Sequence, residues 1–132
     1  MQSKPKILIV EDESIIAMEL RVTLSKLGYV DTSVVNNALA AIEKAEQDKP
    51  DLILMDIMLG GSLDGIEAAK IISFNHFTPI IYVTALKDED TIKRAYLPEP
   101  YIFLMKPYTD YDLKHAIEDM LKNTPPLKMH PV

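Results

Sequence analysis

Short apolar runs alternate with longer amphipathic segments five times along the chain. The apolar runs are rich in Ile, Val and Leu and are too short for helices, so they are typical of buried β-strands. We expect strands at residues 6–10, 29–35, 52–56, 79–84 and 101–105. Strands buried on both faces and joined by helices predict an α/β fold, a single-domain (βα)5 doubly wound parallel sheet.

The segments between these strands carry the spacing and the end signals of helices. Ile16, Leu20, Leu24 and Leu27 form the apolar stripe of the first helix, which Gly28 is expected to end in a left-handed conformation. A short polar helix is expected over residues 88–96. Capping residues are expected before the remaining helices: Asn36 or Asn37, Asp64, and Thr109 with Asp112.

The composition narrows the class of protein. The 132 residues are 48% hydrophobic and 26% charged, which is the balance of one globular domain, and the net charge of -6 argues against direct nucleic-acid binding. The absence of cysteine excludes disulfides and thiolate metal sites, and the apolar run Ile7–Val10 is too short for a membrane span or a secretion signal. We expect a cytoplasmic domain over residues 1–123, followed by a proline-rich tail or linker over 124–132.

Polar residues stand at the carboxyl ends of the predicted strands. Glu11 and Asp12 follow the first strand, Asp56 ends the third, Thr84 ends the fourth, and Lys106 follows the fifth. Ligands of doubly wound sheets bind outside this edge, where the carboxyl ends of the strands meet. We therefore expect these five side chains to converge.

Three carboxylates brought together in this way need a compensating cation, because each pair repels by roughly 4 kcal/mol at 4 Å in an effective dielectric near 20. Oxygen ligands without His or Cys suit a hard ion, and few carboxylates with open positions suit Mg²⁺ better than Ca²⁺. Asp56 could then attack phosphorus as a nucleophile. Lys106 would neutralise charge on the transferring group, and Thr84 would donate its hydroxyl to a phosphoryl oxygen.

Four short stretches together resemble the receiver domain of two-component response regulators: the acidic pair of ILIVEDE, the lone aspartate of LILMDIML, the Thr-Ala of IIYVTAL and the Lys-Pro of IFLMKPY. The resemblance extends over about residues 6–122 and implies the strand order 2-1-3-4-5. It implies that Asp56 is the phosphoacceptor. It also implies a Mg²⁺ site formed by Glu11, Asp12, Asp56 and the backbone carbonyl of Met58.

The same resemblance assigns roles to three further residues. Thr84 and Lys106 would assist catalysis with Asp56, and Thr84 would act with Phe103 as a switch. The phosphoryl group would come from a phosphohistidine on a sensor histidine kinase or a phosphotransfer protein. The chain would not be an enzyme beyond catalysing its own phosphorylation and dephosphorylation.

The resemblance also concerns output. A downstream effector or an attached domain would respond to a surface that changes on phosphorylation, and a phosphorylation-dependent homodimer is one hypothesis. The corresponding patch contains Tyr96, Leu97, Tyr101, Tyr111 and Lys114.

The sequence departs from the common family pattern at four points. The loop before Asp64-Gly65 is one residue longer, and Phe103 lacks the hydroxyl of the commoner tyrosine. Met58 and Leu86 are apolar, so neither side chain can orient an attacking water. We therefore expect slow intrinsic loss of the phosphoryl group.

Other interpretations of these residues remain open at this point. Asp56 taken alone could be a solvated residue at the end of a strand. The acids after the first strand would also interact favourably with the positive end of the dipole of the following helix. A pseudo-receiver would bind partners without phosphorylation. An aspartate-based phosphatase would usually need a second acid where Met58 stands, and a flavin-phosphate site would need a Gly/Ser/Thr-rich loop in place of EDES.

Overall fold

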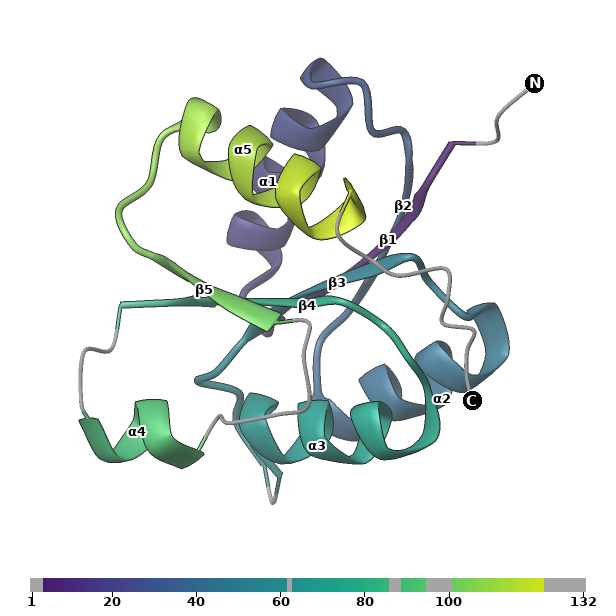
Figure 1. Cartoon of the computed structure of the whole chain (residues 1–132), viewed down its shortest axis with the longest axis vertical. Helices are drawn as coiled ribbons and strands as arrows, with labels where there is room; N and C mark the ends of the chain where they lie inside the picture. The colour runs from purple at the N-terminus through teal and green to yellow at the C-terminus, as the bar shows by residue number, and fades with distance from the viewer. Residues whose placement is uncertain (1–3, 62, 86–88, 95–100, 123–132) are drawn as a thin grey trace.

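The fold is built on one parallel sheet of five strands in the order 2-1-3-4-5, which confirms the predicted doubly wound architecture (Figure 1). The computed structural model describes residues 4–61, 63–85, 89–94 and 101–122. All four strand pairings are parallel. The strands are β1 (Lys6–Val10), β2 (Asp31–Val35), β3 (Leu52–Asp56), β4 (Ile80–Thr84) and β5 (Tyr101–Met105).

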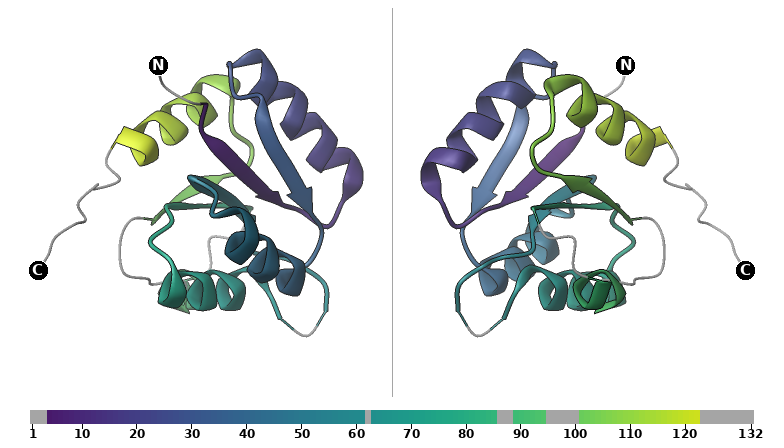
Figure 2. Two further views of the ribbon diagram at one scale, coloured as in Figure 1. Left: turned by 90° about the vertical axis from the view of Figure 1, so that its right-hand side faces the viewer. Right: turned by 90° about the vertical axis from the view of Figure 1, so that its left-hand side faces the viewer.

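The helices lie on both faces of the sheet. They are α1 (Ser14–Lys26), α2 (Ala38–Asp48), α3 (Gly65–Asn75), α4 (Glu89–Arg94) and α5 (Asp110–Lys122). One face is covered by α1 and α5, and α2, α3 and α4 lie on the other (Figures 1 and 2). Within the described parts of the chain, no helix has the length and apolar character that a membrane crossing would require.

Each face of the sheet has its own hydrophobic core, because successive residues of a strand point to opposite sides. In β1, Leu8 and Val10 belong to the core under α2 and α3, whereas Ile7 and Ile9 belong to the core under α1 and α5. Every residue of β3 and β4 is buried. The central strands are therefore enclosed on both faces, as their unbroken apolar sequences predict.

The predicted helix caps are present. Asn37 caps α2 by accepting a 2.8 Å hydrogen bond from the Ala40 amide. Asp64 forms a full capping box with Glu67 at the start of α3. Thr109 and Asp112 exchange two 3.0 Å hydrogen bonds at the start of α5, which is the reciprocal pattern that their sequence predicted.

Two strand boundaries differ slightly from the prediction. The second strand begins at Asp31 and not at residue 29, because the Tyr29 amide donates to the Leu24 carbonyl and belongs to the turn that ends α1. In that turn Gly28 has the expected positive φ of 99°. The fourth strand begins at Ile80, after Pro79, which lacks an amide hydrogen. The ends of the predicted helix 88–96 lie outside the described residues, which show α4 over Glu89–Arg94.

Gly65 brings the first turn of α3 against the end of β3. Its amide donates a 3.1 Å hydrogen bond to the Ile57 carbonyl. A Cβ atom at this position would overlap the backbone carbonyl oxygen of Asp56. Only glycine therefore allows α3 to begin this close to the residue that ends the central strand.

We predict that Gly65→Ala destabilises the fold by at least about 2 kcal/mol, because the backbone at the end of β3 or the start of α3 must move. Urea unfolding followed by circular dichroism measures the change. Gly60→Ala is the matched control, since a Cβ there would meet only Asp12 Oδ2, at 3.9 Å, which is ordinary contact. Equal stabilities for the two variants would contradict the predicted close approach.

Candidate functional site

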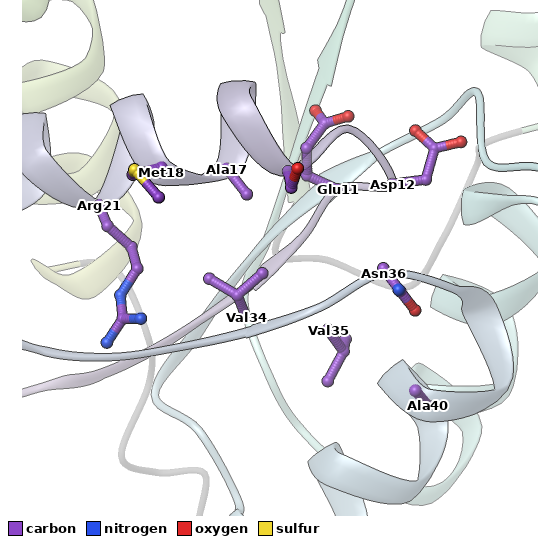
Figure 3. A pocket seen from close by; sticks show the side chains of 10 residues that line it. Glu11, Asp12, Ala17, Met18, Arg21, Val34, Val35, Asn36 and Ala40 are labelled. Carbon is purple, nitrogen blue, oxygen red and sulfur yellow. The ribbon is translucent and has the colours of Figure 1, made fainter.

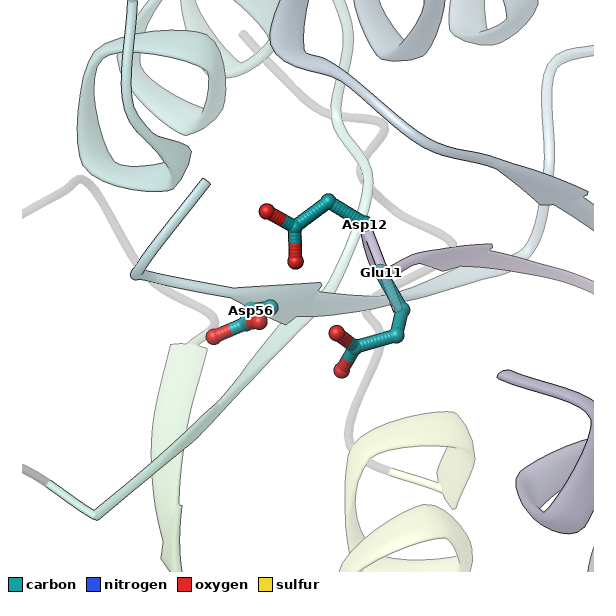
Figure 4. Close-up of side chains that lie close together, drawn as sticks. All are labelled: Glu11, Asp12 and Asp56. Carbon is teal, nitrogen blue, oxygen red and sulfur yellow. The ribbon is translucent and has the colours of Figure 1, made fainter. Parts of the chain in front are cut away.

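Three carboxylates meet at the carboxyl edge of the sheet. Glu11 and Asp12 follow β1, and Asp56 ends the neighbouring strand β3. One oxygen from each carboxylate lies within 4.8 Å of the other two, and the close-up shows the three groups around a common space (Figure 4). The structure thus brings together the three acids that the sequence predicted to converge.

Backbone amides of the surrounding loops hold the three carboxylates in place. The Met58 amide donates to Asp56 Oδ1 at 3.0 Å, and the Glu13 amide donates to Glu11 Oε2 at 3.1 Å. The Gly60 amide donates to Asp12 Oδ2 at 3.3 Å. Each of these contacts uses one carboxylate oxygen, and Glu11 and Asp56 also share a side-chain hydrogen bond.

Burial makes this cluster costly without a cation. Glu11 is 5% exposed and Asp56 is 7% exposed. Burial raises the pKa of Glu11 from 4.5 to about 7, and the negative charge of Asp56 adds to the rise. Burial likewise raises the pKa of Asp56. As the folded chain keeps a proton on Glu11 that the unfolded chain releases, stability without metal falls as the pH rises from 4.5 to about 7.

Lys106 supplies positive charge beside the two buried acids. Its backbone amide donates a 2.9 Å hydrogen bond to the carbonyl of Thr84, so the ends of β4 and β5 are joined next to the cluster. Lys106, Glu11 and Asp56 line one small cavity of about 10 Å³. The lysine charge partly opposes the rise that burial causes in the pKa of both carboxyls. Thr84 is 2% exposed at the same edge.

Tyr108 is part of these surroundings and was missed by the sequence analysis. It lines the small cavity with Asp56 and Lys106, and burial followed by the nearby charge of Glu11 raises the pKa of its hydroxyl. The only signal in the sequence is its place two residues after Lys106. A tyrosine after a Lys-Pro pair has no meaning by itself, so only the fold could reveal its position.

The donor set fits a hard divalent cation such as Mg²⁺. All three side chains offer carboxylate oxygens, and two of them are buried in a place where negative charge needs compensation. The three acids alone would leave coordination positions open for water or for a phosphoryl oxygen. Met58, whose carbonyl was predicted as a further ligand, directs its amide to Asp56 and exposes 62% of its surface.

Phe103, the predicted switch residue, lies in a cluster of three aromatic rings on β4 and β5. It is half-buried and stacks on Tyr82, with ring centroids 5.2 Å apart and an interplanar angle of 25°. Tyr101 meets Phe103 edge-on at 6.1 Å and Tyr82 edge-on at 6.0 Å. Other residues predicted for the switch surface or for water access, Leu86, Tyr96 and Leu97, lie outside the described residues.

A larger cleft of about 510 Å³ borders the site on the side of the edge strand β2. Glu11 and Asp12 lie at one end of the cleft and Arg21 lies at the other, with Val34 and Val35 between them (Figure 3). Asp56 does not line it. Glu11 therefore lines both this cleft and the small cavity at Asp56.

These features define an α/β domain of flavodoxin-like topology with an acidic cluster at the carboxyl edge of its central strands. The chain belongs to the response regulator receiver domain family, whose model matches residues 7–118. The resemblance stated from its four sequence stretches is confirmed.

Two relatives among curated proteins are transcriptional regulators. The transcriptional regulatory protein PdtaR of Mycobacterium tuberculosis is 37% identical over 113 residues, which are 86% of this chain and 55% of the relative. The alkaline phosphatase synthesis transcriptional regulatory protein PhoP of Bacillus subtilis is 35% identical over 121 residues, which are 90% of this chain and 49% of the relative. The chain thus spans about half the length of these relatives.

Solved structures with the same fold include two receiver domains. The signal receiver domain of a modulated diguanylate cyclase from Desulfovibrio desulfuricans matches with a TM-score of 0.84 and 37% identity. The match covers 92% of this chain and 97% of the chain in that structure. The receiver domain of a sensor histidine kinase from Pseudomonas aeruginosa matches with a TM-score of 0.80 and 28% identity. The match covers 92% of this chain and 100% of the chain in that structure. The latter holds a magnesium ion in its active site cleft.

We predict that Mg²⁺ binding weakens as the pH falls through 7, because the cation must displace the proton that Glu11 holds with a pKa of about 7. The apparent affinity at pH 6 should be about tenfold lower than at pH 8, since about a tenth of such a group is ionised at the lower pH. Calorimetric titration with MgCl2 at the two pH values measures the difference.

The control for this experiment is Glu11→Gln, which removes the titrating group. Its affinity for Mg²⁺ should be lower than that of the wild type and should change much less between pH 6 and pH 8. A wild-type affinity that is equal at both pH values would contradict the prediction.

Proposed function

We propose that the chain is a phosphorelay receiver, which accepts a phosphoryl group on Asp56 from a phosphohistidine in a Mg²⁺-dependent reaction. The observation that carries this proposal is the approach of Glu11, Asp12 and Asp56 within 4.8 Å, with Lys106 beside the two buried acids. The chain then signals to a partner or an attached domain through a conformational change.

Asp56 is the nucleophile in this proposal. A carboxylate oxygen of Asp56 forms a bond to phosphorus while the bond from phosphorus to the imidazole nitrogen breaks, and the imidazole leaves with that electron pair and takes up a proton. Lys106 offsets the negative charge on the phosphoryl oxygens, and the Thr84 hydroxyl donates a hydrogen bond to one of them.

Glu11, Asp12, Asp56 and the carbonyl of Met58 would hold the Mg²⁺ ion. The bound ion would reduce the repulsion between the carboxylates and the incoming phosphoryl oxygens. The amide that Met58 donates to Asp56 Oδ1 fixes the orientation of this carboxylate and leaves Oδ2 for the new bond. The buried position of Asp56 limits the access of competing water.

The input would be a sensor histidine kinase or a phosphotransfer protein in the cytoplasm. The output is proposed to use Thr84 and Phe103 as a switch, with exposed Tyr111 and Lys114 and the half-buried Tyr101 on the responding surface. The curated relatives are transcriptional regulators about twice as long as the matched region, which supports output through a further domain or a separate effector. A phosphorylation-dependent homodimer is the alternative form of output.

We predict that the wild type gains one phosphoryl group on incubation with Mg²⁺ and phosphoramidate, and that Asp56→Asn gains none, because the amide is not a nucleophile toward phosphorus. Intact-mass spectrometry measures both proteins. Omitting Mg²⁺ should abolish the gain in the wild type.

The matched control is Asp119→Asn, which makes the same chemical change on the exposed surface of α5. This variant should gain mass like the wild type. If the wild type gains no mass even with a histidine kinase and ATP supplied, the phosphorylation-independent pseudo-receiver is the better assignment.

We predict that Met58→Asn shortens the lifetime of the phosphorylated chain several-fold, because an amide near Asp56 can orient an attacking water and a thioether cannot. The lifetime is measured as the loss of the phosphoryl mass after the donor is removed. Met58→Leu keeps the position apolar and should leave the lifetime unchanged. A longer lifetime in Met58→Asn would refute the role given to Met58.

A further inference from the structure

Asp64 connects two helices through the two oxygens of one carboxylate. Oδ1 accepts a 3.0 Å hydrogen bond from the Glu67 amide and caps α3, whereas Oδ2 lies 2.9 Å from Nη2 of Arg94, the last residue of α4. The two side chains are 29% and 48% exposed, so the ion pair lies at the surface. Asp64 therefore fixes the start of α3 and holds the end of α4.

The start of α3 is in turn fixed to the backbone of the phosphoacceptor. Gly65 follows Asp64 and packs so closely on the Asp56 carbonyl that a Cβ atom would overlap it. The Gly65 amide is also bonded to the Ile57 carbonyl. A backbone displacement at Asp56 would therefore press directly on Gly65 and shift its neighbour Asp64.

We propose that the Asp64–Arg94 ion pair is a latch that couples the backbone of the phosphoacceptor to α4, by a route separate from Thr84 and Phe103. The intact ion pair favours the position of α4 seen in this structure. Loss of the ion pair favours an alternative position of α4 in which Asp56 accepts the phosphoryl group more readily. Phosphorylation of Asp56 and formation of the ion pair act on the same equilibrium between two positions of α4. Each must therefore change the free energy of the other. This inference rests on the proposed function of Asp56.

Two variants break the ion pair without removing other roles of these residues. Asp64→Asn keeps the cap of α3, because Asn is as good an N-cap residue as Asp, but it loses the negative charge. Arg94→Gln removes the positive charge and keeps a long side chain. Lys93→Gln is the matched control, since this exposed neighbour belongs to none of the ion pairs among the described residues.

The first measurement needs no phosphodonor. Hydrogen exchange of the α4 amides, read by mass spectrometry on the whole chain, should be about 2- to 5-fold faster in Asp64→Asn and in Arg94→Gln, as expected for the loss of one exposed ion pair. The double variant should be no faster than either single variant. Exchange as slow as in the wild type, or equally fast in Lys93→Gln, would overturn the latch.

The second measurement is the rate of phosphorylation by phosphoramidate with Mg²⁺, followed by intact mass. Both single variants and the double variant should be phosphorylated about 2- to 5-fold faster than the wild type, and Lys93→Gln at the wild-type rate. Faster exchange with an unchanged phosphorylation rate would overturn the coupling to Asp56. A wild type that gains no phosphoryl group, even with a histidine kinase and ATP supplied, would overturn the proposed function and the coupling with it, while the exchange rates would still decide whether the ion pair holds α4.

Discussion

The structure depends on one electrostatic constraint, the burial of two carboxylates where the central strands end. Glu11 and Asp56 are almost fully buried, and their pKa values rise because burial disfavours the charged form. A chain selected only for stability would place apolar residues there, so the arrangement indicates a function that needs negative charge. Burial of these two carboxylates lowers the stability of the cation-free fold. A bound cation relieves the repulsion between them, so cation binding recovers this free energy.

The neighbouring elements hold these carboxylates in place through their backbones. Backbone amides from Met58, Glu13 and Gly60 each donate to one carboxylate oxygen. Backbone donors hold their positions better than side chains, because they need not order flexible side-chain torsions. The same loops must then approach the strand end closely, and this explains why Gly65 stands where any side chain would strike the Asp56 carbonyl.

Much of this fold could be predicted from the sequence, because its local signals and its overall topology agree. The apolar runs marked all five strands, and the capping residues Asn37, Asp64 and Thr109 begin the helices that they were expected to begin. The acidic cluster could be predicted because the carboxyl ends of parallel strands meet at one edge. The start of β2 was placed two residues too early, because Tyr29 is as suitable for a strand as its neighbours.

Contacts between elements distant in sequence could not be predicted in this way. Arg94 is 30 residues from Asp64, and nothing in the local pattern of either segment indicates the other. Tyr82 reads as one more residue of a buried strand, and only the register of β4 against β5 places it opposite Phe103. Tyr108 likewise gains its position beside Asp56 only from the packing of the segment that follows β5. Specific side-chain pairs of this kind need the three-dimensional register of the fold.

Two modest interactions then set the balance of the proposed switch. Moving Phe103 from Tyr82 would lose a stacked aromatic pair, worth about 0.5–1.5 kcal/mol, and releasing Arg94 from Asp64 would lose an exposed ion pair, worth about 0.2–1 kcal/mol. Together they favour the arrangement seen in this structure by about 0.7–2.5 kcal/mol, which corresponds to a population ratio of about 3 to 70. A bias of this size can be reversed by a few charge-assisted hydrogen bonds to a phosphoryl group, each worth about 1.5–3 kcal/mol. The proposed phosphorylation of Asp56 would therefore be strong enough to reverse this bias.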